Sequence, residues 1–298
     1  MSRVLIAGVA VIDFVFRMES FPDKPEKYRA DGAEIVGGGN AANAAVAISR
    51  LGGEALLASR LGDDQIADMI LSDLNIEGID CSLVHKFSNC RSSFSSIYLD
   101  AAGERQIMNF RDPAIPMDAD WLLANMPSGF QAALADTRWP DAALALMKWA
   151  REMGVPGIID AESPVHEGIL ALEAASHVAF SAQGATELTG EKDVEKAALA
   201  AARQLPGLIV VTDGENGAVS VDQDQPTWHP AFKIDAIDTL GAGDVWHGAY
   251  ALALSQGWPL AESIRFASAA AAIKCTRRGG RDGAPFLSDV QRFLEGTL

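Results

Sequence analysis

The strongest chemical signal in the sequence is a run of small residues that ends in an acid, Asp238-Thr239-Leu240-Gly241-Ala242-Gly243-Asp244. Small residues at Gly241, Ala242 and Gly243 let backbone N–H groups converge, and the helical segment that follows adds partial positive charge, so the turn suits a phosphate group. An isolated Gly-Asp pair would be a simple helix cap, but this run is longer than a cap needs. An anion hole beside the Asp244 carboxylate suits phosphoryl transfer, where the attacking hydroxyl needs a proton acceptor.

A second segment rich in glycine, Gly37-Gly38-Gly39-Asn40-Ala41-Ala42-Asn43, leads into another helical segment. The glycines allow the backbone to approach a ligand closely, and Asn43 offers an amide to polar hydroxyls. A glycine-rich turn with an asparagine cap is the alternative interpretation. The spacing matches neither G-x-G-x-x-G nor G-x-x-x-x-G-K-[ST], so we expect neither a Rossmann dinucleotide site nor a P-loop.

The elements that must position these residues alternate along the chain, and this alternation predicts an α/β domain with a mostly parallel sheet covered by helices on both faces. Ligands of such sheets bind at the carboxyl ends of the strands. The predicted strands are Val4–Ile12, Ala55–Ser59, Leu134–Thr137, Gly157–Asp160, His177–Ser181 and Leu208–Thr212. The predicted helices are Asn40–Leu51, Gln65–Asn75, Ala142–Met153, Glu167–Ala175, Val194–Gln204, Asp244–Gln256, Leu260–Thr276 and Leu287–Gly296.

Residues 13–36 and 91–110 interrupt the alternation. The second stretch is typical of a hairpin, Phe94–Leu99 and Gln106–Phe110 around the turn Asp100–Gly103. We expect both stretches to form one small β lid that projects from a main domain made of residues 1–12, 37–90 and 111–298. Exposed strand edges that carry Phe14, Phe16 and Phe94 favour a homodimer formed through this lid.

Composition excludes several classes of partner. The 298 residues carry 40 acidic and 24 basic side chains, a net charge of −16, which argues against nucleic acid and anionic membranes. Three scattered cysteines fit a reducing compartment, and no long apolar run predicts a membrane span. Asp13 directly follows the apolar run Val4–Ile12, which is therefore expected to be a strand rather than a signal segment, and the protein is expected to be cytoplasmic.

The two glycine-rich segments, together with the turn Val211–Ala218, closely resemble the signatures of the PfkB, or ribokinase-like, family of carbohydrate kinases over essentially the whole chain. The resemblance implies a three-layer α/β/α domain with a small β lid. It also implies transfer of the ATP γ-phosphate to a sugar hydroxyl, with Mg²⁺ as the metal cofactor.

Carried over by position, the resemblance makes Asp244 the catalytic base and makes the amides of Gly241, Ala242 and Gly243 the anion hole. The residues expected to contact the sugar are Asp13, Gly38, Gly39 and Asn43. The residues expected to contact the nucleotide are Thr212, Asp213, Gly214, Gly217, Gly279 and Gly280. We expect basic residues between Lys274 and Arg281 to add positive charge at the ATP end, while His247 either lines the nucleotide pocket or packs in the helix.

One departure from the family concerns the metal. Many members carry an Asn-x-x-Glu motif that organises Mg²⁺, but here Ser181 and Gly184 stand in its place. We therefore assign no protein-held metal site, and ATP oxygens and water can hold Mg²⁺ instead. We interpret Glu187 as a solvated helix charge.

The finer resemblance is to the 6-deoxy-6-sulfofructose kinases and is least close at Arg111. The segments that carry it are Lys27-Tyr28, Asn109-Phe110, Leu134–Trp139, Pro230–Lys233, Gly243–Ala249, Arg265–Ser268 and Lys274–Arg281. A sulfonate needs hydrogen-bond donors at the far end of the sugar from the C1 hydroxyl that is phosphorylated, and Lys27, Asn109 and Arg138 could supply them. Lys27 could equally be a solvated edge charge, and Asn109 could simply alternate with apolar neighbours.

Three alternatives to this substrate stay open. The first is a neutral ketohexose such as fructose, and the second is a nucleoside. The third belongs to another class, a sugar-sensing protein without turnover, which the missing Asn-x-x-Glu motif would explain.

Overall fold

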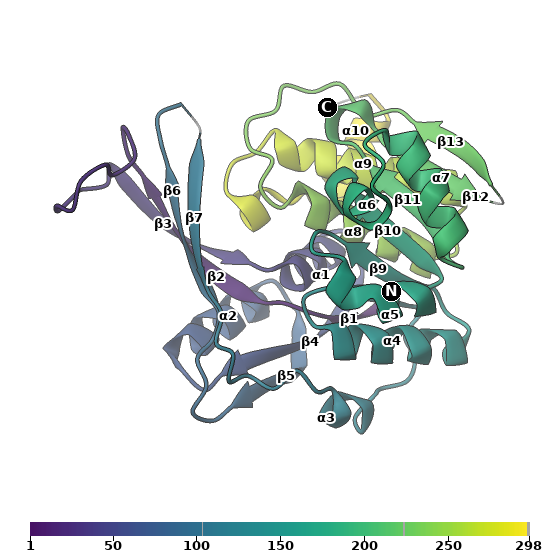
Figure 1. Ribbon diagram of the computed structural model, residues 1–298, viewed down its shortest axis with the longest axis horizontal. Helices are drawn as coiled ribbons and strands as arrows, with labels where there is room; N and C mark the ends of the chain where they lie inside the picture. Colours follow the sequence, from purple (N-terminus) through teal and green to yellow (C-terminus); the bar gives the residue numbers. More distant parts are fainter. Residues whose placement is uncertain (103, 223, 297–298) are drawn as a thin grey trace.

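A nine-stranded sheet forms the centre of the computed structural model, which describes residues 1–102, 104–222 and 224–296 (Figure 1). The seven strands from β11 to β5 are all parallel to one another, and β12 is antiparallel to β11 and to β13. In spatial order they are β13 (Gln225–His229), β12 (Ala218–Asp222), β11 (Leu208–Thr212), β10 (His177–Ser181), β9 (Gly157–Ala161), β8 (Ala132–Asp136), β1 (Arg3–Ala7), β4 (Glu54–Gly62) and β5 (Asp80–Phe87). The predicted, mainly parallel sheet is confirmed.

Helices cover both faces of this sheet because alternate side chains of its strands are apolar on both sides. Val4 and Ile6 of β1 pack into one buried cluster, and Leu5 and Ala7 pack into the other. The first face is covered by α1 (Asn40–Arg50), α2 (Gln65–Ile76), α8 (Ala242–Ser255), α9 (Leu260–Cys275) and α10 (Leu287–Leu294). The second is covered by α3 (Asp120–Leu123), α4 (Pro140–Met153), α5 (Ile169–Ala174), α6 (Ala182–Thr189) and α7 (Val194–Gln204). The three-layer architecture is therefore confirmed.

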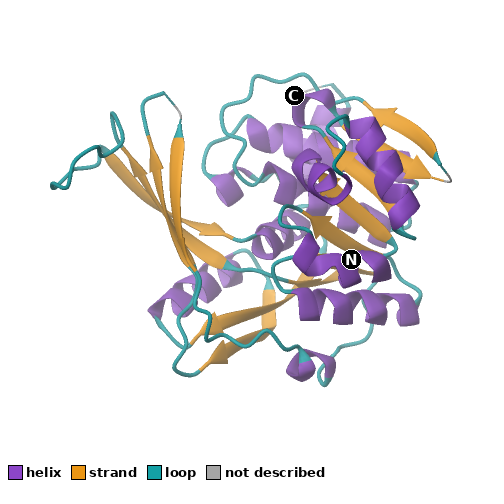
Figure 2. Ribbon diagram, viewed as in Figure 1, coloured by secondary structure: helices purple, strands orange, loops and turns teal. Residues whose placement is uncertain are grey.

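A separate four-stranded sheet projects from the main body (Figure 2). Its spatial order is β3 (Gly32–Gly38), β2 (Val11–Arg17), β6 (Phe94–Leu99) and β7 (Arg105–Phe110). The two stretches that interrupt the alternation thus share one lid sheet, as predicted, although Gly103 of the expected turn lies outside the described residues. Phe14, Phe16 and Phe94 lie on the interior strands β2 and β6, so the expectation that they sit on exposed edges is wrong.

The prediction of one strand over Val4–Ile12 is also wrong, because β1 and β2 divide this run between the two sheets. The chain turns at Gly8, where a Cβ would lie 2.1 Å from the Asp136 carboxylate. That carboxylate accepts a hydrogen bond from Val9 N at 2.7 Å and fixes the change of direction. The edge strand β5, the strands β12 and β13, and the short helices α3 and α6 had not been predicted.

No helix among the described residues is both long and apolar enough to span a membrane. The three cysteines, Cys81, Cys90 and Cys275, are all unpaired thiols.

Helix α8 crosses α1 at very close range. A Cβ on Gly248 would lie 2.5 Å from the carbonyl oxygen of Ala44. We expect Gly248→Ala to separate the two helices and to lower the free energy of unfolding by about 1–3 kcal/mol, measured by urea denaturation.

Gly243→Ala is the matched control for Gly248→Ala. Gly243 also lies in α8, and a Cβ there would meet no described atom within 4 Å. The control should be neutral or slightly stabilising, since alanine favours a helix over glycine by about 1 kcal/mol. Equal destabilisation by both substitutions would contradict the close crossing.

Candidate active site

Asp244 and Asn43 meet at the place where the first turns of α8 and α1 lie side by side. Asn43 Nδ2 donates a hydrogen bond to Asp244 Oδ2 at 2.6 Å. The close crossing at Gly248 brings these helix ends together, although 201 positions separate the two residues in the sequence. The structure thus joins two residues that the sequence had suggested separately.

Arg281 fixes the orientation of the Asn43 amide. It lies in the short helical turn η3 (Gly280–Gly283) and is only 2% exposed. Its Nε donates to Asn43 Oδ1 at 2.9 Å, its Nη2 donates to the carbonyl oxygen of Gly38 at 2.9 Å, and its Nη1 pairs with Asp73. Because Oδ1 faces the guanidinium, the NH₂ group of Asn43 must face Asp244.

We predicted that the basic residues from Lys274 to Arg281 add positive charge at the ATP end. This prediction is largely wrong, because most of these side chains bind other groups of the protein. Besides Arg281, Lys274 is fully buried and donates to the carbonyl oxygen of Asp238 at 2.7 Å. Arg277 pairs with Asp289 at 3.0 Å. Of the four cations between Lys274 and Arg281, only Arg278 both lines a cleft and makes no ion pair among the described residues.

The Asp244 carboxyl has the properties of a general base. Burial raises its pKa to about 7, the negative charge of Asp160 adds to the rise, and the hydrogen bond from Asn43 opposes it. A base with a pKa near neutral pH can both accept and release a proton.

Asp160 and His247 form a buried pair beneath Asp244. Asp160 Oδ1 lies 3.5 Å from His247 Nδ1, and neither atom has a hydrogen-bond partner among the residues that the structure describes. His247 Nε2 lies 3.2 Å from the carbonyl oxygen of Ala179, so Nε2 carries a proton. His247 is only 4% exposed. Of the two predicted roles, lining the nucleotide pocket or packing in the helix, the structure agrees with packing.

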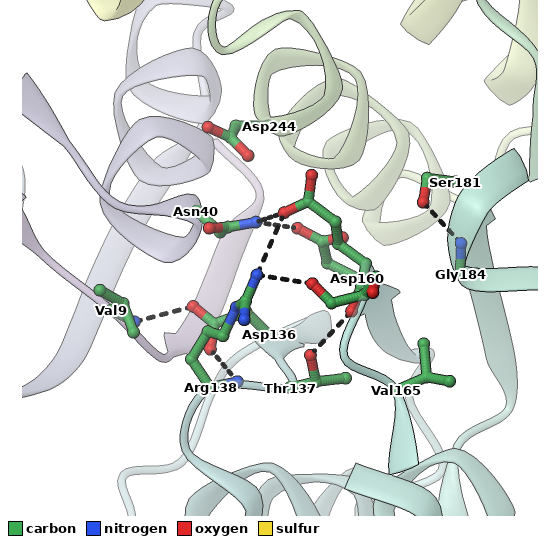
Figure 3. A network of polar contacts seen from close by, with 12 residues as sticks. Val9, Asn40, Asp136, Thr137, Arg138, Asp160, Val165, Ser181, Gly184 and Asp244 are labelled. Carbon is green, nitrogen blue, oxygen red and sulfur yellow. Dashed lines mark hydrogen bonds and ion pairs between the residues drawn. The ribbon is translucent and has the colours of Figure 1, made fainter. Parts of the chain in front are cut away.

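Polar side chains at the carboxyl ends of β8 and β9 extend the site (Figure 3). Asn40 Nδ2 donates to Asp160 Oδ2 at 3.2 Å and to Glu162 Oε2 at 2.9 Å. Arg138 Nη2 donates to the carbonyl oxygen of Ser163 at 2.7 Å and lies 3.9 Å from Glu162 Oε2. The Arg138 guanidinium is thus bound by its own chain and turned toward Glu162.

Two amides of the predicted anion hole are available to a ligand. Gly241 is the N-cap of α8 with φ 76°, a conformation that glycine adopts without strain. Ala242 N donates to the carbonyl oxygen of Thr239 at 3.2 Å. Within the described part of the chain, the N–H groups of Gly241 and Gly243 have no protein acceptor and can bind an anion.

The expected nucleotide residues lie in two loops. At the end of β11, Asp213 N donates to the carbonyl oxygen of Gly217 at 2.7 Å and closes a turn that contains Gly214, while Thr212 Oγ1 donates to the carbonyl oxygen of Phe180. In the second loop, Gly279 N donates to Asp238 Oδ2 at 3.0 Å, and the longer contact from Gly280 N measures 3.5 Å.

A cleft of about 570 Å³ separates the lid from the second of these loops. Gly279, Gly280 and Arg278 line it on one side, and Glu34 and Arg105 of the lid line it on the other. The predicted lid thus faces one of the two loops expected to contact the nucleotide.

The inner face of the lid carries a row of polar side chains. Asp13, Ser95 and Asn109 are directly paired across β2, β6 and β7. Asn109 Nδ2 donates to Ser95 Oγ at 3.2 Å. Asp13 packs over Gly38, where a Cβ would lie 2.4 Å from Asp13 Oδ2, and Gly39 begins α1 as its N-cap. Lys27 is exposed in the β2–β3 connection, and no polar contact among the described residues joins it to this row.

The residues that stand in place of Asn-x-x-Glu have structural roles. Ser181 Oγ caps α6 by accepting from Gly184 N at 3.0 Å. Glu187 accepts from Ser163 Oγ at 2.5 Å and from Val165 N at 3.0 Å, so our interpretation of Glu187 as a solvated charge is wrong. It anchors the loop to which Arg138 is bound.

Several site residues were not identified from the sequence, including Asp136, Asp160 and Asn40, and Arg281 had been assigned to the ATP end instead of to the contact with Asn43. Asp136 and Asp160 had a usable signal, since each lies at the carboxyl end of a buried strand, where ligands bind. Arg281 had none, because its partners are distant in sequence.

Comparison with known proteins agrees with this geometry. Residues 1–287 match the model of the pfkB family of carbohydrate kinases. Fructokinase-1 of Zea mays is 31% identical over 98% of this chain and 97% of its own length, and ribokinase of Bacillus subtilis is 24% identical over 99% of this chain and 100% of its own. A solved structure from Agrobacterium tumefaciens is 35% identical with a TM-score of 0.89, covering 99% of this chain and 98% of that one. The chain therefore belongs to the pfkB family of carbohydrate kinases.

Proposed function

We propose that this protein transfers the γ-phosphate of ATP to the C1 hydroxyl of a ketose that carries an anionic group at C6, with 6-deoxy-6-sulfofructose as the best candidate. The observation that carries the phosphotransfer step is the Asp244 carboxylate, hydrogen-bonded to Asn43 and lying beside the free N–H groups of Gly241 and Gly243.

In this mechanism Asp244 accepts the proton of the attacking hydroxyl. The N–H groups of Gly241 and Gly243 donate to the phosphate oxygens and stabilise the charge that develops during transfer. Asn43, held by Arg281, keeps the Asp244 carboxylate pointed at the acceptor and limits the rise of its pKa. Asp13 lies next to Gly38 on the sugar side and can accept hydrogen bonds from other hydroxyls.

Mg²⁺ would neutralise charge on the phosphates when it is bound. No group of three acidic, histidine or cysteine side chains among the described residues could hold a metal ion. A magnesium ion carried by ATP needs only one or two carboxylates, and Glu162, which is half-exposed beside Asn40, fits that role.

The substrate assignment rests on the lid and on Arg138. Asn109 lies at the end of the polar row on the inner face of the lid, where it can donate to the far end of the sugar. Arg138 would have to exchange its bond to Ser163 for one to the sulfonate, and Lys27 would have to approach from the exposed β2–β3 connection. A neutral ketohexose remains the second candidate, because Zea mays fructokinase-1 is among the similar proteins. A nucleoside and a non-catalytic sugar sensor are outcomes that the assays below distinguish.

We expect Asp244→Asn to lower kcat by roughly 10²–10⁴-fold, because it removes the proton acceptor. In the wild type, kcat/KM should rise with pH and level off above about 7, where the Asp244 carboxyl ionises. A coupled assay of ADP release measures both effects, and Glu152→Gln on the exposed surface of α4 is the control. Full activity of the folded Asp244→Asn variant would refute the proposed mechanism.

The same substitution should stabilise the unliganded fold. The folded state raises the pKa of Asp244 from 3.8 to about 7, so folding favours the protonated carboxyl and stability is lost as pH rises through this window. Asp244→Asn carries no charge to bury and should melt above the wild type at pH 8, with a smaller difference at pH 5. Thermal melts of both proteins at pH 5 and pH 8 test whether the fold raises the pKa of the Asp244 carboxyl.

We expect Arg138→Ala to raise KM for 6-deoxy-6-sulfofructose by roughly 10–100-fold, as the loss of a charge-assisted hydrogen bond would. KM for fructose should change little, because fructose has no anion for Arg138 to bind. Steady-state kinetics with both ketoses and a nucleoside panel tests this. Equal losses on both ketoses would exclude Arg138 from substrate recognition.

We also propose that the outer face of the lid joins two copies of the chain. Phe14, Phe16 and Tyr98 lie on this face. Ile35 and Met108, on the two edge strands of the same face, are 57% and 72% exposed. Sedimentation should show a dimer at micromolar concentration for the wild type and a monomer for Met108→Glu. A monomeric wild type would contradict the dimer.

A further inference from the structure

We infer that a cavity at the base of the lid, lined by Arg60, Asn109 and Arg111, is the site that binds the anionic end of the sugar, and that Arg111 determines the preference for an anionic ketose. This inference rests on the proposed phosphorylation of a ketose. It adds Arg60 and Arg111, which the sequence had not suggested, to Asn109, which it had.

The cavity has a volume of about 300 Å³ and lies where three elements of the site end. Residues 8–11 after β1, Ser59 and Arg60 near the end of β4, and Asn109 near the end of β7 all line it. Ligands of parallel sheets bind at this edge. The cavity therefore lies within reach of a molecule bound over the site.

Arg60 supplies a fixed positive charge to the cavity. Its Nη1 donates to the carbonyl oxygen of Pro116 at 2.7 Å, and its guanidinium stacks 4.7 Å from the centre of the Trp139 ring. Burial lowers the pKa of Arg60 to about 10, the carboxylates of Asp136, Asp141 and Asp118 oppose the decrease, and the neighbouring charge of Arg111 adds to it. The two guanidinium groups are thus close enough to repel each other.

Arg111 has no hydrogen bond or ion pair with any residue that the structure describes. The one acidic residue lining the cavity is Asp112, whose carboxylate accepts from Arg91 N at 2.7 Å and from Ala114 N at 2.9 Å. Two neighbouring cations therefore face a cavity whose single carboxylate is already bound by backbone amides. In a protein of net charge −16, two guanidinium groups that line one cavity favour an anionic ligand there.

A row of paired side chains connects the cavity to the reacting end of the site. Asp13, beside Gly38, is paired with Ser95, and Ser95 is paired with Asn109. Neighbouring strands lie about 4.8 Å apart, so the row spans about 10 Å. A ketose bound against this row with its C6 substituent toward β7 would bring that substituent to Asn109, beside Arg111.

Arg111 and Arg138 differ in their availability. Arg138 is bound to Ser163 and lies near the Glu162 carboxylate, whereas Arg111 is exposed and unpaired. A planar guanidinium binds two oxygens of a tetrahedral oxyanion at once, so both a sulfonate and a phosphate at C6 fit this chemistry.

The test compares Arg111→Gln with the wild type on fructose, 6-deoxy-6-sulfofructose and fructose 6-phosphate. We expect KM for the preferred anionic ketose to rise by roughly 10–100-fold, with kcat and the KM for fructose within about 3-fold of the wild type. Arg203→Gln, an exposed arginine in the last turn of α7, is the matched control and should leave all three substrates unaffected. A thermal melt that matches the wild type shows that Arg111→Gln is folded.

Calorimetry on the Asp244→Asn background measures binding without turnover. The dissociation constant of 6-deoxy-6-sulfofructose or of fructose 6-phosphate should rise by the same factor when Arg111→Gln is added. The anionic ketose that responds identifies the oxyanion as a sulfonate or a phosphate.

The outcomes separate this inference from the proposed function. If the wild type prefers an anionic ketose and Arg111→Gln retains that preference, the role of Arg111 is overturned while the proposed kinase activity stands. If the wild type binds and phosphorylates fructose but neither anionic ketose, the proposed substrate and the anion site fail together.

Discussion

The buried guanidinium of Arg281 is the contact on which the geometry of the site depends. Taking a cation out of water is costly, and the cost is offset only when its partners are all in place. Here they come from three separate segments: Asp73 of α2, Asn43 of α1 and the carbonyl oxygen of Gly38. The position of a Cβ on Gly37 is occupied by the Arg281 guanidinium itself. Part of the glycine-rich segment therefore makes room for a protein contact rather than for a ligand.

This arrangement concentrates carboxylates at one edge of the sheet. The charges of Asp160 and Glu162 raise the pKa of Asp244, and the charge of Glu162 raises the pKa of Asp160. Asn40 donates to Asp160 and Glu162, and Asn43 donates to Asp244. Repulsion among these carboxylates costs stability, but it gives Asp244 a pKa near neutral pH, which suits a base in proton transfer. The raised pKa of Asp244 thus favours the proposed proton transfer and lowers the stability of the fold. The cationic cavity at Arg60 and Arg111 lies at the other end of the polar row.

The fold could be predicted where the pattern along the chain is local. The hairpin strand Phe94–Leu99 and the helix Val194–Gln204 have the predicted bounds, because alternation and helical periodicity depend only on near neighbours. The prediction was wrong for Val4–Ile12, where two strands of different sheets form one continuous apolar run. The edge strand β5 alternates partly buried and exposed residues and gave too weak a signal. The boundary at Gly8 depends on Asp136, which is 128 positions away.

For the site, the sequence by itself determined the chemistry, and only the tertiary structure decided the partners. The run Gly241–Asp244 and the segment Gly37–Asn43 suggested a base, an anion hole and a sugar amide, because each motif is contiguous. The buried roles of Arg281 and Lys274, the binding of Arg138 to Ser163 and the free state of Arg111 could not be predicted, since a charged side chain looks the same in sequence whether it is buried or solvated. Its state depends on groups that only the folded chain brings within hydrogen-bond distance.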